Sequence, residues 1–408
     1  MTNTNVILVS GSRHTVPPSK NSPGAPRIIE TLSNSDVEGM CFKVISKYND
    51  SLKLQNYNTD KFLHIRPTVV NRFFEKLLHY VPLKVKKRIF GYALPDRIVY
   101  YESIKRLIKK EKPDIIITFM HFELFKKLHK LYPKAKHIYF FRSTDLQMRL
   151  GTDNIAYLAN HSDGFLANTK SPIQELQSIY PNLNIPKETI YNAVNLNDFS
   201  DKISDELSKQ YREKLNLTSE DFIIGYAGRL SEEKSILELF EAISYFKSKG
   251  QKVHLLIAGS IKIETTPNKH YYKDIMTYYD EHLSDQVHFL GWIPNEHLYE
   301  FYNALDIGVL LSKYSEGNSM FLLESLSMGT PVIATNIGGN IEMISDGENG
   351  FLIDSQDIKQ NVIQTLDNIL KDKSQLNKMS EKAVNYIRQN HTDEIMLDKF
   401  NNFIKKFE

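Results

Sequence analysis

The chain has 408 residues, of which 41% are hydrophobic and 25% charged, an ordinary composition for a globular protein with a sizeable core. The single cysteine, Cys41, excludes an internal disulfide, and no apolar run approaches the ~18 residues that a membrane span requires. The net charge of +2 hides an asymmetry, because residues 1–195 carry 29 Lys and Arg against 16 Asp and Glu, whereas the remainder carries 22 against 33. The basic half either faces an anionic partner or simply complements the acidic half.

Short apolar runs alternate with helical segments from the N-terminus onward. Val6–Val9 reads as a buried strand and not as a signal peptide, because no basic segment precedes it. A Pro/Gly-containing loop then leads into a helix that begins near Pro26. Residues 59–92 are basic and amphipathic. Further strands are expected in the first half at residues 41–46, Ile115–Phe119, 137–141 and 163–167.

The same pattern restarts after a polar stretch between Asn195 and Asp221. Ile223–Ala227 is a strand followed by a tight loop and a helix, and five more apolar runs follow, at residues 252–260, 287–293, 306–312, 330–336 and 350–354. Continuous apolar runs indicate strands buried on both faces, so parallel sheets covered by helices. We therefore predict an α/β protein with two doubly wound Rossmann-like domains facing across a cleft. The expected boundaries are 1–195, 196–390 and a last helix, 391–408, that returns to the first domain.

A basic pair follows the first strand of the second half. Arg229 lies directly after Ile223–Ala227, and Lys234 lies five residues further on, in "GRLSEEK". Ligands of open parallel sheets bind beyond the carboxyl ends of the strands. A guanidinium and an ammonium at that edge suit a diphosphate. The alternative is that both are ordinary surface cations.

Two glutamates stand eight residues apart in "SEGNSMFLLESLSMGTPVIATNIGGN". We expect Glu316 to lie in a loop and Glu324 to lie one to two turns into a helix that starts near Ser319. The free N–H groups at the start of that helix would face an anion between the two carboxylates. A nucleotide-sugar fits this arrangement. The alternative for Glu324 is a solvated helix position, although its apolar neighbours argue that a carboxylate there needs a partner.

These segments together resemble the donor half of a family 4 glycosyltransferase, a retaining enzyme of GT-B fold. "GRLSEEK" and the paired-glutamate segment occur in order with "IYNAVNLNDF", "LLIAGS" and "VHFLGWIPNEHL". The resemblance is strong over residues 160–360 and weak in the N-terminal half.

The resemblance implies donor-binding and catalytic roles for the matching residues. Arg229 and Lys234 would bind the donor diphosphate, Glu316 the hydroxyls of the donor sugar and Glu324 the ribose hydroxyls. The other donor contacts would be largely backbone groups, from Gly291, Trp292 and Ile293 around the base and from Gly317, Asn318, Ser319 and Met320 around the sugar and phosphate. UDP is the nucleotide that the family suggests.

Several positions depart from the family pattern. Ser235 and Ser319 replace glycines, and Gly24, followed by Ala25, is what remains of a Gly-Gly loop near the donor phosphates. Arg142 stands where many relatives carry a catalytic histidine, so it either steadies an anion or forms a salt bridge with Asp145. His121, after strand Ile115–Phe119, also points at the expected cleft; the alternative is a structural role, which is the more common one for a lone histidine.

No metal or cofactor is expected, because no Asp-x-Asp lies in a plausible loop and no His/Cys cluster has ligand spacing. Nucleic acid is not expected as a partner, since aromatic side chains do not interleave with the basic clusters. Residues 75–92 form a basic amphipathic segment, either an ordinary surface helix or a peripheral contact with an anionic membrane. We expect a cytoplasmic protein, with peripheral contact at the inner face of the plasma membrane as one alternative.

The sequence therefore favours a retaining hexosyltransferase or N-acetylhexosaminyltransferase. Its acceptor would be a cell-surface glycan, a teichoic-type polymer, a lipid-linked sugar or a protein. The alternatives are a nucleotide-sugar epimerase of the same fold and a non-enzymatic glycan-binding protein with a decayed site.

Overall fold

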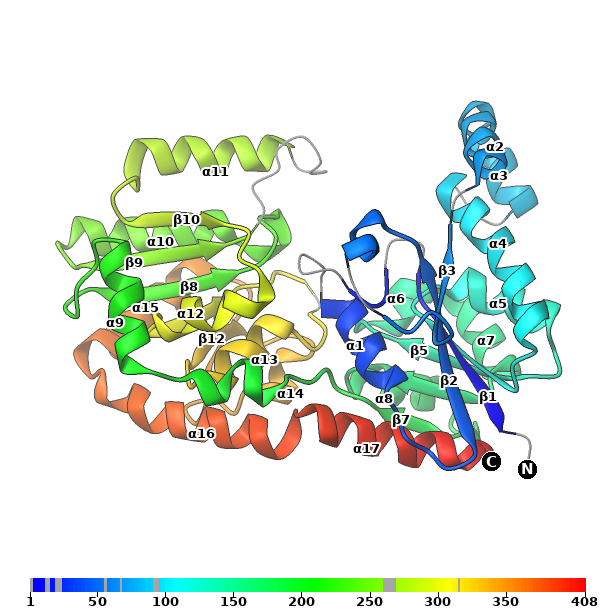
Figure 1. The fold of residues 1–408 in the computed structure, drawn as a ribbon. Helices are drawn as coiled ribbons and strands as arrows, with labels where there is room; N and C mark the ends of the chain where they lie inside the picture. Colours follow the sequence, from blue (N-terminus) through cyan, green and yellow to red (C-terminus); the bar gives the residue numbers. More distant parts are fainter. Residues whose placement is uncertain are drawn as a thin grey trace. The chain divides into compact units, whose positions relative to one another are not determined.

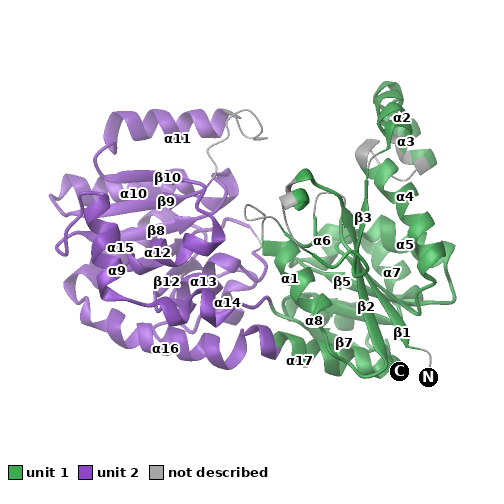
Figure 2. Ribbon diagram, viewed as in Figure 1, with its two compact units in different colours: residues 1–191, 396–408 green, residues 192–395 purple. Residues whose placement is uncertain are grey.

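The computed structural model describes residues 3–11, 15–18, 24–54, 57–66, 68–90, 95–259, 269–314 and 316–408. The chain divides into two compact units, shown in Figure 2. Unit 1 comprises residues 1–191 together with 396–408, and unit 2 comprises residues 192–395. Each unit is an α/β body built on its own parallel sheet, which confirms the predicted fold class of two Rossmann-like domains.

Unit 1 has a seven-stranded sheet in the order β3-β2-β1-β4-β5-β6-β7. Every neighbouring pair is parallel. The strands are β1 (Thr4–Val9), β2 (Met40–Lys47), β3 (Phe62–Ile65), β4 (Ile115–Phe119), β5 (Lys136–Phe141), β6 (Gly164–Ala167) and β7 (Lys187–Thr189). The central strands are apolar on both faces because helices cover both sides of the sheet.

The helices of unit 1 follow its strands in chain order. They are α1 (Gly24–Ser33), α2 (Val69–Tyr80), α3 (Leu83–Phe90), α4 (Pro95–Glu111), α5 (Phe122–Leu131), α6 (Leu146–Leu150), α7 (Thr152–His161) and α8 (Ser171–Ile179). The segment 59–92 is not helical throughout, because its start forms β3. This edge strand has only four residues, two of them half-buried, so its apolar signal is short.

Unit 2 repeats the arrangement with six strands in the order β10-β9-β8-β11-β12-β13. They are β8 (Phe222–Ala227), β9 (Val253–Ala258), β10 (Val287–Gly291), β11 (Ile307–Leu310), β12 (Val332–Thr335) and β13 (Gly350–Ile353), all parallel. The helices are α9 (Asp205–Lys214), α10 (Ile236–Ser248), α11 (Lys269–His282), α12 (Leu298–Asn303), α13 (Met320–Ser327), α14 (Asn340–Met343), α15 (Ile358–Lys371) and α16 (Ser374–Asn390).

The last helix, α17 (Asp393–Ile404), carries the chain back into unit 1, which it joins at Met396. Phe400 of α17 is fully buried, and its ring centroid lies 6.2 Å from that of Phe42 on β2. The C-terminal residues are therefore part of the core of unit 1 and not a loose tail.

In both sheets the chain order reverses beside the first strand. In unit 1 the reversal lies between β1 and β4, and in unit 2 it lies between β8 and β11. Loops diverge on opposite faces of the sheet at such a point and leave a crevice at the carboxyl ends of the strands. This edge is where binding residues are expected in each unit.

Candidate functional site

Three side chains meet at the reversal point of unit 2. Lys234 ends a 3₁₀ turn, Glu232–Lys234, after β8, and Ser312 and Glu316 follow β11. The Lys234 ammonium donates to Ser312 Oγ at 3.1 Å and forms an ion pair with Glu316 Oε2, while Ser312 Oγ donates to the same oxygen at 2.5 Å. The side chains of Lys234 and Glu316 are only 15% and 16% exposed. The two predicted residues thus form one partly desolvated charged cluster, which includes a serine that sequence reasoning missed.

A glycine pair fixes the backbone of Glu316. The N–H of Gly339 donates to the carbonyl oxygen of Glu316 at 2.7 Å. Gly338 has φ +52°, and a Cβ at this position would lie 2.3 Å from that same oxygen. The "GG" of the sequence therefore serves both a left-handed backbone conformation and a close approach to the Glu316 loop. No local signal links these residues to Glu316, because the contact depends on β12 lying beside β11.

Glu324 is buried within α13, with 4% of its surface exposed. The hydroxyl of Tyr302, at the end of α12, donates to Glu324 Oε2 at 3.0 Å. Residues 321–327 of this helix are all buried, so a carboxylate among them requires polar partners. The alternative of a solvated helix position for Glu324 is therefore wrong, and Tyr302 is a partner that the sequence did not reveal.

Asn192, the first residue of unit 2, holds the loop before α13 through hydrogen bonds to Asn318. Asn318 is 4% exposed, and Asn192 binds it twice, from its backbone N–H to Oδ1 at 2.6 Å and from Nδ2 to its carbonyl at 2.5 Å. Gly317 is half-buried beside it. Ser319 caps α13 without a side-chain hydrogen bond to the helix, so the first-turn N–H groups from Met320 onward have no hydroxyl cap. Such a helix start presents N–H donors to an anion.

Arg229 does not join the Lys234 cluster. Its side chain is 81% exposed and pairs with Glu233 at 2.8 Å, four residues along the chain. The backbone around it is well fixed, because the Tyr226 hydroxyl donates to the Arg229 carbonyl at 2.7 Å. Burial, and then the charge of Glu316, raise the pKa of Tyr226, which therefore stays protonated as a donor. The structure thus places Arg229 at the same edge, with a guanidinium directed to solvent.

Ser235 stands where the family pattern has glycine, and its backbone adopts the left-handed conformation that favours glycine. Its φ is +53°, in the left-handed region, and it caps α10 while remaining fully buried. A non-glycine residue in this conformation costs about 1 kcal/mol or more. The replacement of glycine by serine is therefore tolerated at some cost in strain, directly beside Lys234.

The proposed base-binding segment follows β10. Gly291 has φ +69°, and its carbonyl accepts from the N–H of Gly259 at 2.7 Å. Trp292 is 45% exposed, whereas Ile293 packs against the core of unit 2. The segment follows the carboxyl end of β10, the edge strand next to β9, and β8 separates these two strands from β11.

In unit 1, His121 lies at the reversal point between β1 and β4. Its Nδ1 is 3.0 Å from the Tyr101 hydroxyl. A Cβ at Gly11, which follows β1, would lie 2.0 Å from His121 Nε2, so only glycine leaves room for the imidazole. The glycine of "SGS" after the first strand is the sequence feature that permits this close approach.

Arg142 follows β5 in the same unit. Its guanidinium carbon lies 5.8 Å from the centroid of the Phe140 ring, and its backbone N–H donates to Met120 Sδ at 2.8 Å. Desolvation lowers the pKa of Arg142 to about 10, so the side chain still carries its charge at neutral pH. Gly24 is the first residue of α1, and residues 19–23 of its loop lie outside the described part of the chain.

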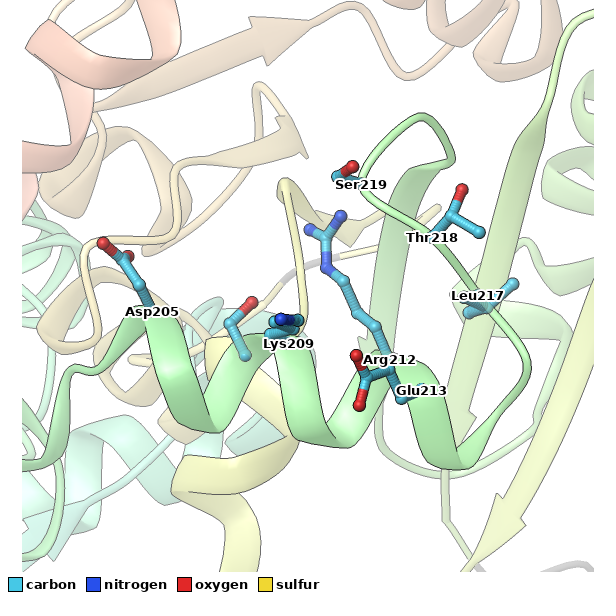
Figure 3. A pocket seen from close by; sticks show the side chains of 8 residues that line it. Asp205, Lys209, Arg212, Glu213, Leu217, Thr218 and Ser219 are labelled. Atoms are coloured by element: carbon cyan, nitrogen blue, oxygen red, sulfur yellow. The ribbon is translucent and has the colours of Figure 1, made fainter.

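Two surface cavities of unit 2 lie at the opposite edge of its sheet. One, of about 490 Å³, is shown in Figure 3 and is lined by α9 and the loop before β8, including Lys209, Arg212 and Thr218. The other, of about 440 Å³, is lined by residues at the starts of β8, β11 and β12 and by the beginning of α16. Arg212 is already engaged by Asp306 at 3.1 Å and the Ala304 carbonyl at 3.0 Å. Both cavities lie at the amino ends of the strands, away from Lys234 and Glu316.

Comparison with known proteins matches residues 208–386 to the family model described as "Glycosyl transferases group 1". The chain is 25% identical over 213 residues to the capsular polysaccharide biosynthesis glycosyltransferase CapM of Staphylococcus aureus, a match that spans 50% of this chain and about half (52%) of that protein. It is 22% identical over 337 residues to the lipopolysaccharide 1,2-N-acetylglucosaminetransferase of Salmonella typhimurium, covering 81% of this chain and 84% of that protein.

Solved structures share the fold over almost the entire chain. Sucrose-phosphate synthase from Thermosynechococcus elongatus aligns with a TM-score of 0.76 at 17% identity, covering 99% of both chains. Anabaena Alr3699/HepE, solved in complex with UDP and glucose, aligns with a TM-score of 0.73 at 14% identity, covering 99% of this chain and 100% of that one. At these identities the likeness shows the fold, that of the GT-B glycosyltransferases.

Proposed function

We propose that this chain is a retaining glycosyltransferase that moves a hexose or N-acetylhexosamine from a nucleotide-diphosphate sugar, UDP-linked by preference. The acceptor would be a glycan, polymer, lipid-linked sugar or protein in cell-surface polysaccharide or teichoic-type glycan synthesis. The observation that carries the proposal is the cluster of Lys234, Ser312 and Glu316 at the reversal point of the unit 2 sheet. The match of residues 208–386 to group 1 glycosyl transferases supports it.

Lys234 and Glu316 could exchange their mutual contact for contacts with a bound donor. Lys234 is held by a carboxylate, which can accept other hydrogen bonds, and by a hydroxyl, which can both donate and accept them. A diphosphate would draw the ammonium to itself, which would leave Glu316 free to accept hydrogen bonds from sugar hydroxyls. Positive charge on the leaving diphosphate is the main physical requirement of the reaction. Lys234, the start of α13 and the exposed Arg229 would supply it.

Glu324 would bind the ribose hydroxyls from α13. Tyr302 already fixes one of its oxygens, which orients the carboxylate in advance. The segment Gly291 to Ile293 would contact the base largely through its backbone. In unit 1, we assign His121 and Arg142 to the catalytic machinery, Arg142 as a permanent positive charge for an anionic group. The reaction would need no divalent metal, so Lys234 and Arg229 would have to stabilise the negative charge of the leaving diphosphate.

Nucleotide-induced stabilisation tests the donor proposal. A donor nucleotide at 100 times its dissociation constant should stabilise the protein by about 2.7 kcal/mol, a clear rise in melting temperature. A panel of UDP, GDP, ADP and their sugars would be compared in the wild type and in Lys234→Ala. Lys382→Ala is the matched control, because Lys382 forms an exposed ion pair with Glu348 in the same unit.

The expected result is a shift with one nucleotide class that Lys234→Ala abolishes and Lys382→Ala retains. The absence of a shift with every nucleotide, or a shift retained by Lys234→Ala, would refute the site. Turnover of the sugar nucleotide with no acceptor would point to the epimerase alternative. Anomeric configuration of the product, read by NMR, and activity in EDTA test the retaining and metal-independent parts.

A further inference from the structure

The exposed apolar side chains of the described residues are concentrated on two helices of unit 1. More than half of those that are large and exposed fall between Val69 and Ile89, on α2 and α3. Figure 1 shows these helices projecting beyond the end of β3. The most exposed are Tyr80 (89%), Val69 (85%), Val70 (74%), Ile89 (66%) and Phe73 (64%). Such a concentration on two consecutive helices marks an interaction surface, because single exposed apolar residues are normally scattered.

On α2 these side chains share one face. At about 100° per residue, Val69, Val70, Phe73, Leu77 and Tyr80 fall within an arc of about 100°. Leu78 points elsewhere and is 3% exposed, in the core cluster that includes residues of α4. The helix is thus anchored to unit 1 through one face and presents a second apolar face to solvent.

Basic side chains border the apolar face. Arg72 and Lys76 lie on the flank of α2, four residues apart, and Lys84 and Arg88 are similarly spaced on α3, beside the exposed Val85 and Ile89. Residues 69–90 contain six Lys and Arg but a single acidic residue, Glu75. Lys86, one of the basic residues expected on the membrane-facing segment, is instead 8% exposed and turned inward.

We propose that α2 and α3 form an interfacial anchor for an anionic lipid bilayer, with the apolar face in the acyl boundary and the basic flank at the headgroups. This combination of an apolar face and a cationic border is what an interfacial helix requires. The anchor starts at Val69, six residues before the segment 75–92 that the sequence indicated. No helix in the described ranges is long and apolar enough to cross a membrane. The proposal is independent of the proposed donor chemistry.

A second copy of the chain is a poorer occupant of this face. A two-fold interface would bring the same surface against itself and set the four exposed cations of one copy against those of the other. A single acidic residue in the segment cannot neutralise them. An anionic bilayer complements both the apolar and the basic parts at once.

Vesicle flotation of the full chain tests the anchor. Vesicles of phosphatidylcholine alone would be compared with vesicles that contain about 30 mol% phosphatidylglycerol. The apolar variant is Val70→Ser/Phe73→Ser, with Met148→Ser on α6, 69% exposed, as its control. The basic variant is Lys76→Ala/Lys84→Ala/Arg88→Ala, with Lys109→Ala/Lys110→Ala on α4 as its control.

The expected result is binding to the anionic vesicles and not to the neutral ones. Each basic residue near the surface contributes about fivefold to the partition coefficient, so the triple variant should lose about 100-fold. The apolar variant should lose a comparable amount, while both controls bind as the wild type does. All the altered residues are exposed, and an unchanged melting temperature would verify that the variants fold.

Three outcomes would overturn the proposal: no binding to anionic vesicles, equal binding to neutral vesicles, or binding that neither variant reduces. Sedimentation velocity addresses the alternative occupant. A dimer that Val70→Ser/Phe73→Ser dissociates, with no vesicle binding, would assign the face to a second copy. Nucleotide-induced stabilisation of the same variants keeps the two proposals separable, because an anchor variant that still responds to its nucleotide has lost only the membrane contact.

Discussion

Replacement of Glu316 by glutamine is the most direct perturbation of the unit 2 site. The change keeps the shape of the side chain but removes the charge that is paired with Lys234. Ser312 Oγ remains 3.1 Å from the ammonium, so the cation retains one polar partner. We expect Glu316→Gln to lower stability and to abolish sugar transfer, while binding of the nucleotide alone survives. The phosphates would then find Lys234 without a competing carboxylate.

The size of the stability loss follows from the burial of the pair. At about 4 Å and an effective dielectric constant of about 20, two unit charges attract each other by about 4 kcal/mol before desolvation is subtracted. Removal of one partner from a fully buried pair costs about 3–5 kcal/mol. Here the side chains are 15% and 16% exposed and Ser312 remains, so we expect a loss of about 2 kcal/mol. This corresponds to a fall in melting temperature of about 4–8 °C for a unit of this size.

A double-mutant cycle with Lys234→Met isolates the interaction. Urea unfolding of the wild type, Glu316→Gln, Lys234→Met and the double variant would be followed by circular dichroism. The double variant should be more stable than the two single losses predict, by at least about 1 kcal/mol, because each single change leaves one polar group without its charged partner. Losses that add to within about 0.5 kcal/mol would refute the pairing on which the site is built.

Three further predictions concern a close backbone contact and two buried polar side chains. Gly338→Ala should weaken nucleotide binding and lower stability by about 2 kcal/mol or more, because φ is +52° and the added Cβ would meet the Glu316 carbonyl oxygen. The control is Gly250→Ala, where φ is +70° but the space around the Cβ is open. It should cost only about 1 kcal/mol of stability and leave nucleotide binding unchanged. Calorimetry of both variants checks this, and equal effects on binding would contradict it. Tyr302→Phe should destabilise the protein by about 1.5–3 kcal/mol, because the buried Glu324 carboxylate loses a donor. Tyr386→Phe should cost only about 1 kcal/mol, because the Tyr386 hydroxyl donates to the uncharged backbone carbonyl of Glu342. Urea unfolding midpoints of the two variants check this, and a smaller loss for Tyr302→Phe would contradict the role of its hydrogen bond. Burial lowers the pKa of His137, so the folded state keeps the ring neutral while the unfolded chain takes up a proton near pH 6.5. This contribution to stability is complete above about pH 6.5 and is lost as the pH falls below it, so the melting temperature should fall less steeply towards pH 5 in His137→Gln than in the wild type, and parallel curves would contradict the assignment.

The fold was largely predictable because its signal is local. Each central strand is a short run of apolar residues, and β4 occupies Ile115–Phe119 as expected. The first strand of unit 2 begins one residue earlier than predicted, at Phe222. β3 was missed because it is an edge strand of four residues, of which the two middle ones are only half-buried. Strands with one partner and partial burial carry too little apolar sequence to stand out.

The candidate site was predictable by residue but not by arrangement. Lys234 and Glu316 were both expected at the carboxyl edge of the sheet, yet their direct pairing was not. Arg229, expected to work beside Lys234, pairs instead with Glu233 and remains largely exposed. The local pattern around Glu324 required a partner, but Tyr302 lies 22 residues away on another helix.

Sequence alone determined that this chain forms two parallel β-sheets covered by helices, because the apolar pattern of each strand extends over only a few residues and can be recognised without the other strands. It also determined which charged residues follow the strands. Only the tertiary structure decided which of them meet. Lys234 and Glu316 are 82 residues apart, and they pair because the sheet order sets β8 beside β11. That adjacency is a property of the packed sheet, in which long-range strand pairing places side chains that no local pattern relates.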